Sequence, residues 1–346
     1  MDLKQLTLTA RDLVAPGKGI LAADESAPTI KKRFDSIKVE STEDNRRIYR
    51  EMLFRTEGAS QYISGVILYD ETLRQKAADG TPLVKVLQSQ GVIPGIKVDK
   101  STKPLAGAEN EVVTEGLDGL RERLKEYYDL GARFTKWRAV ITIGKNIPSR
   151  YCIEVNAHAL ARYAALSQEA NLVPIVEPEV LMDGEHTIER CYEVTEATLR
   201  ETFHELAKQR VVLEGMLLKP NMVVAGTESP AGRARTEDVA EKTVTCFKHT
   251  VPSAVPGIVF LSGGQGDEEA TVNLNAINQY AAKAGAPWKL SYSYGRGLQA
   301  APLKAWAGKP ENIVRAQRAY HHRAQLTSAA ALGKYTPDME KEPVKA

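Results

Sequence analysis

Short apolar runs that end in polar or charged residues recur along the chain. They cover residues 19–26, 63–70, 92–99, 132–138, 173–179, 216–219, 258–264 and 290–296. Bulky apolar side chains in these runs predict strands that are buried on both faces, as in a parallel sheet covered by helices. In 132–138 the alternation places Lys136 and Arg138 on one face, and in 173–179 it places Glu177 and Glu179 on one face.

The sequence between these runs predicts helices. Segment 117–130 repeats leucine and tyrosine at helical spacing and is followed by Gly131, the usual position of a helix-ending glycine. Further helices are expected at 3–14, 153–171 and 186–210, and Ser41 with Asp44 gives a weak capping signal for a helix that runs to residue 58.

Strands that alternate with helices, starting roughly 30 to 46 residues apart, favour an α/β fold of the (β/α)8 TIM barrel type over an open sheet. No domain boundary is evident in the sequence. The expected organisation is therefore a single barrel domain with an N-terminal helix over residues 1–332. A polar tail over residues 333–346 is expected to be mobile.

Charged side chains gather at the predicted strand ends, where barrel enzymes carry their chemistry. They are Asp24, Lys97, Asp99, Lys136, Arg138, Glu177, Glu179, Lys219 and Arg296. A random scatter of surface charge would not favour this placement, so these residues form the candidate site.

Lys219 closes an apolar strand and is followed by Pro220, which restricts it to extended geometry. A lone lysine at this place has two interpretations: a side chain that reaches out from a sheet edge to water, or a desolvated amine that acts as a nucleophile. The nucleophile must be uncharged, which requires a lysine pKa near neutrality instead of about 10.4, a difference of about 4 kcal/mol. The charges at the other strand ends favour the second interpretation.

Lys136 is the cation that can disfavour a proton on Lys219, and the alternative is that Lys136 pairs with Glu177. An iminium at Lys219 would stabilise the carbanion formed when a neighbouring carbon–carbon bond breaks. Asp24, Glu177 and Glu179 are available for the proton transfers, and each can instead be a structural ion-pair partner.

The last two loops predict an anionic substrate. Ser262, Gly263 and Gly264 present backbone donors, and Ser293, Gly295 and Arg296 follow the next strand. Barrel phosphate sites often form between these two loops, although Gly263–Gly264 can also be a simple turn. The basic pair Lys32–Arg33 can bind a second phosphate or form a solvated helix face.

Composition excludes several other functions. The 346 residues carry a net charge of +2, so neither nucleic acid nor an acidic membrane surface is indicated as a partner. Cys152, Cys191 and Cys246 are far apart, which suits a reducing compartment. No signal-peptide pattern or long apolar span is seen, so a cytoplasmic location is expected. The histidines His158, His186, His204 and His249 are isolated in the sequence, and no metal or other cofactor is expected.

These segments together resemble the class I, Schiff-base fructose-1,6-bisphosphate aldolases from the first helix to about residue 332. The resemblance rests on seven stretches, namely 21–26, 95–99, 136–138, 174–179, 217–222, 260–265 and 293–296. It implies reversible cleavage of fructose 1,6-bisphosphate to dihydroxyacetone phosphate and glyceraldehyde 3-phosphate, without a metal, in glycolysis and gluconeogenesis. It also implies a homo-oligomer, often a tetramer.

The resemblance further implies residue roles. Lys219 would form the Schiff base, Glu177 would be the main acid and base, and Asp24 would assist cleavage at the C4 hydroxyl. Lys136 would support carbinolamine chemistry, with Glu179 shaping the charge network. Contacts to the C1 phosphate would come from Ser262, Gly263, Gly264, Ser293, Gly295 and Arg296, and other substrate contacts from Lys97, Arg138 and Arg33.

Two features depart from the family. Animal members end in a tyrosine that visits the active site, whereas this sequence ends Pro343-Val344-Lys345-Ala346, and Tyr335 cannot simply take that role. Members with a sequence resembling Ser-Thr-Gly after the acidic pair differ from Ser26-Ala27-Pro28 here. Two alternatives remain: a Schiff-base aldolase for a one-phosphate sugar, and a catalytically idle barrel that binds partners.

Overall fold

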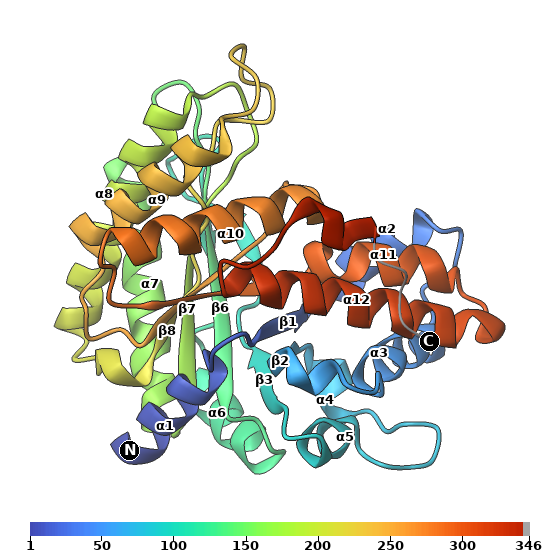
Figure 1. Ribbon diagram of the computed structural model, residues 1–346. Helices are drawn as coiled ribbons and strands as arrows, with labels where there is room; N and C mark the ends of the chain where they lie inside the picture. Colours follow the sequence, from blue (N-terminus) through green and yellow to red (C-terminus); the bar gives the residue numbers. More distant parts are fainter. Residues whose placement is uncertain (342–346) are drawn as a thin grey trace.

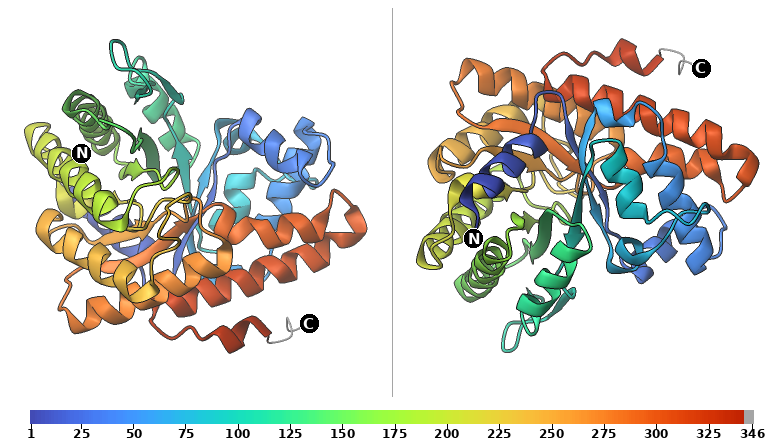
Figure 2. Two further views of the ribbon diagram at one scale, coloured as in Figure 1. Left: turned by 90° about the horizontal axis from the view of Figure 1, so that it is seen from above. Right: turned by 90° about the horizontal axis from the view of Figure 1, so that it is seen from below.

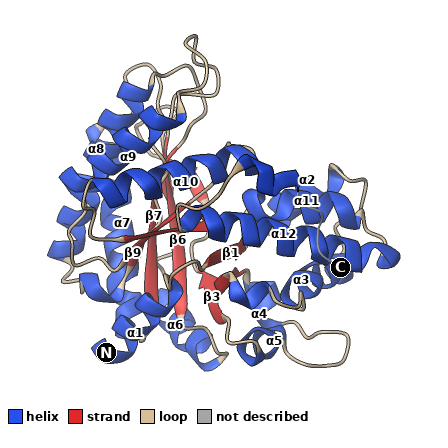
Figure 3. Cartoon of the chain, viewed as in Figure 1, coloured by secondary structure: helices blue, strands red, loops and turns tan. Residues whose placement is uncertain are grey.

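Parallel strands close into a barrel at the centre of the molecule, and helices surround it (Figures 1 and 3). The computed structural model describes residues 1–341. Within that range the barrel order is β1-β10-β9-β8-β7-β6-β3-β2. The barrel strands are β1 (Gly19–Ala23), β2 (Ile63–Leu68), β3 (Ile93–Lys97), β6 (Phe134–Ile141), β7 (Val173–Val180), β8 (Leu217–Leu218), β9 (Gly257–Phe260) and β10 (Lys289–Tyr294). The predicted (β/α)8 TIM barrel is thereby confirmed.

Helices follow most of the strands and form the outer layer, as the two end-on views show (Figure 2). The α-helices are α1 (Leu3–Leu13), α2 (Ala27–Asp35), α3 (Glu43–Phe54), α4 (Asp70–Arg74), α5 (Leu83–Ser89), α6 (Leu120–Asp129), α7 (Arg150–Glu169), α8 (Ile188–Lys208), α9 (Thr236–Thr250), α10 (Asp267–Lys283), α11 (Arg296–Trp306) and α12 (Ile313–Ala331). Short 3-10 turns are η1 (Ala59–Gln61), η2 (Leu213–Gly215), η3 (Pro310–Asn312) and η4 (Pro337–Lys341).

Local capping residues decide the helix boundaries, and some differ from the sequence prediction. The cap of α3 is Thr42, whose side chain accepts from the Asn45 amide, so the prediction of Ser41 is wrong by one residue. Helix α6 begins only after Gly119, which has a φ of 64°. It ends as predicted before Gly131, whose φ of 108° suits glycine.

Apolar side chains fill the lower part of the barrel. Strand residues such as Phe134, Ile175 and Leu217 pack there with Leu6 and Leu13 of α1, which closes the amino-terminal end of the barrel. Space for the Phe134 ring depends on Gly95, because a Cβ atom there would lie 2.3 Å from the ring. With this end of the barrel filled, the charged side chains of the strands gather at the carboxyl ends.

A short antiparallel hairpin is inserted between β3 and α6. Its strands are β4 (Thr102–Pro104) and β5 (Val112–Thr114), which pair through register partners such as Lys103 and Val113. The sequence did not predict it, because two three-residue strands are too short to show a pattern.

The described part of the C-terminal tail packs against the barrel helices. Tyr335 is buried, and Glu340 forms an ion pair with the buried guanidinium of Arg323 in α12, with an N–O distance of 2.8 Å. The expected domain boundary near residue 332 and the mobility of the tail stay predictions. Residues 342–346 of that tail lie outside the described residues.

Candidate active site

The candidate residues named from the sequence line one cavity of about 890 Å³ at the carboxyl ends of the strands. They are Asp24, Arg33, Lys97, Lys136, Arg138, Glu177, Glu179, Lys219, Ser262, Gly263, Gly264, Ser293, Gly295 and Arg296, together with Asp99 and Lys32. Strand register explains this convergence. Lys97 is opposite Lys136 on neighbouring strands, and Arg138 is opposite Glu177.

Lys219 is held at the tip of β8 with its side chain only 5% exposed. Its amide donates to the Val176 carbonyl at 2.8 Å, which extends the pairing of β8 with β7 by one residue. Its Nζ lies 3.3 Å from Oε1 of Glu177. The amine is therefore inside the barrel mouth and beside a carboxylate, and does not reach out to water.

Lys136 joins two carboxylates from opposite sides of the barrel mouth. Its Nζ lies 2.7 Å from Oδ2 of Asp24 on the β1 side and 3.4 Å from Oε2 of Glu177 on β7. The alternative that Lys136 pairs with Glu177 is thus observed, and the shorter contact to Asp24 had no signal in the sequence. Together the four side chains form a continuous buried line, Asp24–Lys136–Glu177–Lys219.

Burial and neighbouring charges shift the pKa values of Lys136 and Asp24 in opposite directions. Burial alone would lower the pKa of Lys136, but the negative charges of Asp24, Glu177 and Asp99 outweigh it and hold that pKa well above the ordinary lysine value. Burial would likewise raise the pKa of Asp24, yet the charges of Lys136 and Lys219 hold it well below the ordinary aspartate value. Lys136 is therefore a protonated acid and Asp24 an ionised acceptor.

A second set of ion pairs lies on the β3 and β6 side of the cavity. Lys97 pairs with Asp99 at 2.7 Å, and Arg138 pairs with Glu179. The other carboxylate oxygen of Asp99 accepts from the Arg138 amide at 3.3 Å. These contacts fix two cations at the cavity wall, where they can meet an anionic or hydroxylated substrate.

The loops after β9 and β10 form a cup of hydrogen-bond donors. The cup consists of Ser262, Gly263, Gly264, Ser293, Gly295 and Arg296. Arg296 opens α11 and donates to the Gly263 carbonyl, which ties the two loops together. The buried hydroxyl of Ser293 has no hydrogen-bond partner among the described residues. The N-terminus of α11, with no acidic residue in its first turn, adds a favourable field for an anion.

Arg33 approaches the same cup from α2. It pairs with the buried carboxylate of Glu25, and one of its guanidinium nitrogens lies 3.4 Å from the position of a Cβ atom built on Gly295. Glu25 also accepts from Gln299 at 2.8 Å and lies 3.7 Å from the buried Arg50. The sequence placed Glu25 at the strand end but did not indicate that it holds Arg33.

The cavity also contains residues that the sequence did not single out. Ser101, Leu181, Met182, Asp183 and Thr227 come from loops, where no periodic pattern points to a site. Thr29 lies in α2, Ser36 caps its end, and Thr102 opens the short strand β4. Ser26 and Thr29 lie next to the predicted basic pair, with their hydroxyl oxygens 3.1 Å apart. These hydroxyl groups add donors on the α2 side.

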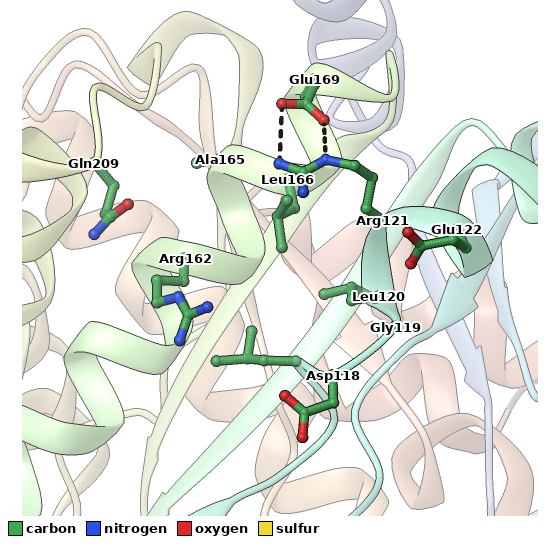
Figure 4. Close-up of a pocket in the computed structure, with 11 residues that line it drawn as sticks. Asp118, Gly119, Leu120, Arg121, Glu122, Arg162, Ala165, Leu166, Glu169 and Gln209 are labelled. Atoms are coloured by element: carbon green, nitrogen blue, oxygen red, sulfur yellow. Dashed lines mark hydrogen bonds and ion pairs between the residues drawn. The ribbon is translucent and has the colours of Figure 1, made fainter.

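Two other groupings lie away from this cavity. A hollow of about 460 Å³ lies along α6 and α7, where Arg121 pairs with Glu169 at 2.6 Å (Figure 4). On α8, possible metal-ligand atoms of Glu201, His204 and Glu205 lie within 4.8 Å of one another.

His158, His204 and His249 are isolated along the sequence but have polar neighbours in the structure, and His249 Nδ1 lies 2.9 Å from the Tyr192 hydroxyl. His158 Nδ1 lies 2.8 Å from Glu205 Oε2, and His204 belongs to the group on α8. The Glu205 carboxylate is also engaged by Lys208 at 2.6 Å.

Among the described residues no helix is long and apolar enough to span a membrane.

Comparison with known proteins gives one consistent result. The family model for fructose-bisphosphate aldolase class-I matches residues 5–346. A probable fructose-bisphosphate aldolase class 1 of Xanthomonas campestris pv. campestris is 59% identical over 97% of this chain and 99% of its own length. Cytosolic fructose-bisphosphate aldolase 4 of Arabidopsis thaliana is 56% identical over 97% of this chain and 85% of its own length. The Plasmodium falciparum aldolase, solved with TRAP and a small-molecule inhibitor, has a TM-score of 0.94 and 52% identity, covering 96% of this chain and 95% of its own.

Proposed function

The chain belongs to the class I fructose-bisphosphate aldolases, the metal-independent Schiff-base type, and from this premise we propose that Lys219 forms the Schiff base. Its reaction is the reversible cleavage of fructose 1,6-bisphosphate to dihydroxyacetone phosphate and glyceraldehyde 3-phosphate, a step of glycolysis. One observation carries the residue assignment: the buried line Asp24–Lys136–Glu177–Lys219 at the barrel mouth.

Schiff-base formation begins with a proton transfer from Lys219 to its neighbour Glu177. Glu177, 3.3 Å away, takes a proton from the ammonium group, and the free Nζ attacks the C2 carbonyl of the open-chain sugar. A proton then moves from the attacking nitrogen to the new alkoxide, which gives the carbinolamine. Glu177 returns its proton to the carbinolamine hydroxyl, which leaves as water and gives the iminium. Lys136 remains protonated throughout, since its positive charge offsets the two adjacent carboxylates.

Cleavage follows on the other side of Lys136. Ionised Asp24 accepts the proton of the C4 hydroxyl, the C3–C4 bond breaks, and the electron pair moves into the iminium to form an enamine. Glyceraldehyde 3-phosphate leaves. The proton that Asp24 accepted is given back to the enamine carbon, and hydrolysis by water then releases dihydroxyacetone phosphate and restores the amine and ionised Asp24.

Different parts of the cavity suit the two phosphates of fructose 1,6-bisphosphate. The cup formed by Ser262, Gly263, Gly264, Ser293, Gly295 and Arg296 suits the C1 phosphate, because it combines backbone donors, an unpartnered hydroxyl and a guanidinium. Lys32 lines the α2 side with Ser26 and Thr29, which suits the second phosphate. Lys97 and the Arg138–Glu179 pair line the wall of the cavity formed by β3, β6 and β7, and they suit the sugar hydroxyls.

The assignment of Lys219 is tested with Lys219→Arg, which keeps a positive charge but removes the nucleophile. Fructose 1,6-bisphosphate turnover should fall by more than about 10³-fold, as for loss of other covalent nucleophiles. Binding of inorganic phosphate, which forms no Schiff base, should change by less than about tenfold when measured by calorimetry. Lys31→Arg on the exposed face of α2 is the matched control and should cleave normally. A cleaving Lys219→Arg enzyme would contradict the assignment.

Turnover of fructose 1-phosphate against the bisphosphate decides whether the second phosphate subsite matters. We expect the bisphosphate to be preferred, because Lys32, Ser26 and Thr29 line the cavity. A strong preference for fructose 1-phosphate would favour an aldolase for one-phosphate sugars. An idle barrel that only binds partners would cleave neither sugar.

We further propose a homo-oligomer, tetrameric by the family resemblance, and a cytoplasmic location. The second proposal is supported by relatives that are named cytosolic, such as Arabidopsis aldolases 4 and 6. Sedimentation equilibrium of the purified chain tests the first, since a 38.0 kDa species at micromolar concentration would contradict it.

A further inference from the structure

Met182 covers a donor of the proposed phosphate cup. The backbone N–H of Gly264 donates to the thioether Sδ of Met182, with a nitrogen–sulfur distance of 3.0 Å. A Cβ atom at Gly264 would lie 2.9 Å from that sulfur and 3.1 Å from Cγ, so the side chain rests directly on the glycine. Met182 is 6% exposed and lines the cavity.

This contact competes with a phosphate for the same donor. A thioether is a weak acceptor, whereas a phosphate oxygen carries charge and forms a shorter and stronger hydrogen bond. The Gly264 N–H cannot be shared at full strength between the two. A bound phosphate must therefore displace the sulfur.

The displacement requires only the side chain to move. The backbone around Met182 is fixed, because the Leu181 amide donates to Ile141 at 2.9 Å and the Thr227 amide donates to the Met182 carbonyl at 2.8 Å. The loops after β7 and β8 therefore lie side by side, beyond the upper ends of the strands in Figure 1. A methionine side chain is unbranched and has three rotatable bonds, so it can turn within the cavity while these loops stay in place.

We propose that Met182 is an internal competitor for the phosphate: its thioether satisfies the Gly264 N–H in the free protein and turns away when a phosphate oxygen binds. The inference rests on the proposed function, since it assigns the cup to a substrate phosphate. Met182 thus weakens phosphate binding without touching the reacting carbons. Its removal should change affinity and not the rate of the chemical steps.

The test uses Met182→Leu, which keeps the volume but removes the acceptor, and Met182→Ala, which removes both. Met222→Leu is the control, because Met222 is also buried and its sulfur accepts from Gln265 at 3.6 Å behind the same loop. The probe is inorganic phosphate, measured by calorimetry with the full chain. Circular dichroism establishes that each variant is folded, and either Met182 variant alone is sufficient for the comparison.

Both Met182 variants should bind phosphate roughly three- to tenfold more tightly than the parent protein, the range expected for release from one competing hydrogen bond. The KM for fructose 1,6-bisphosphate should fall in the same direction with kcat within about twofold. Met222→Leu should match the parent protein. Equal or weaker phosphate binding by the folded Met182 variants would overturn the inference.

Phosphate binding requires no turnover, which separates this inference from the proposed function. Tighter binding by the Met182 variants in a protein that cleaves no sugar would support the role of Met182 and contradict the proposed function. Normal sugar cleavage together with unchanged phosphate affinity in the Met182 variants would support the proposed function and contradict the role of Met182.

Discussion

Asp24→Asn should slow C–C cleavage and leave Schiff-base formation intact, and so separate these two halves of the proposed reaction. The substitution removes the acceptor of the C4 hydroxyl proton and leaves the pair of Lys219 and Glu177, 3.3 Å apart, in place. General-base catalysis contributes typically 10²- to 10⁴-fold, so C–C cleavage should slow by that factor, about 3 to 5 kcal/mol in the barrier. Schiff-base formation with dihydroxyacetone phosphate should persist.

The same substitution also has a stability cost that can be estimated from the contacts. Removing one partner of a buried ion pair costs about 3 to 5 kcal/mol when the other charge is left uncompensated. Lys136 would lose its 2.7 Å contact to Asp24 but keep Glu177 at 3.4 Å. We therefore expect a loss of at most about 3 kcal/mol in the free energy of unfolding.

The pH dependence of that loss has a defined sign. The pKa of Asp24 in the folded protein lies below its ordinary value of about 3.9, so ionised Asp24 stabilises the fold above that pH. This stabilisation disappears as pH falls toward the folded pKa. Urea unfolding of Asp24→Asn and the parent protein should therefore differ most above the ordinary aspartate pKa of about 3.9, and the difference should shrink as pH falls below that value.

Single-turnover cleavage and borohydride trapping measure the two halves of the reaction separately. Asp35→Asn is the control, because Asp35 forms an exposed ion pair with Lys31 and such pairs contribute little. Cleavage at the parent rate in Asp24→Asn would refute its role as base. Loss of both cleavage and trapping in a folded variant would show instead that Asp24 is needed before the C–C bond breaks.

Three further changes have distinct expected outcomes. Ser293→Ala removes a buried hydroxyl without a hydrogen-bond partner among the described residues, so KM should rise about three- to tenfold with kcat unchanged, and steady-state kinetics will show whether it does. Gly95→Ala places a Cβ atom 2.3 Å from the Phe134 ring, and urea titration should reveal a loss of about 1 to 3 kcal/mol or more; an unchanged midpoint would argue against the tight packing. Glu340→Gln breaks the ion pair with Arg323, so hydrogen exchange should accelerate over residues 334–341 while exchange in the barrel strands stays unchanged.

The sequence predicted the barrel because its strands are short apolar runs with charged ends, and these two signals are local. The same reasoning brought Lys219, Lys136, Glu177 and Asp24 to one edge, since parallel strands in a barrel end on the same side. Which residues pair there depends on contacts across the barrel. The Asp24–Lys136 contact joins residues more than a hundred positions apart, and no periodic pattern encodes it.

Loop residues were the least predictable part of the site. Met182 lies in an irregular loop, and its contact with Gly264 depends on the packing of one loop against another. The hairpin β4–β5 was missed because its strands have only three residues each, and the contact between Arg33 and Glu25 joins single side chains that no periodic pattern links. Helix ends shifted by a few residues because single side chains, such as Thr42, decide where the first amide groups are capped.

Borohydride reduction in the presence of dihydroxyacetone phosphate tests whether Lys219 forms the Schiff base. Borohydride reduces an iminium to a stable amine, so the bound three-carbon unit becomes covalently attached. We predict irreversible inactivation, one adduct per chain that peptide mapping assigns to Lys219, and no effect of a metal chelator. An adduct on another lysine, no adduct, or activity that a chelator abolishes would contradict it.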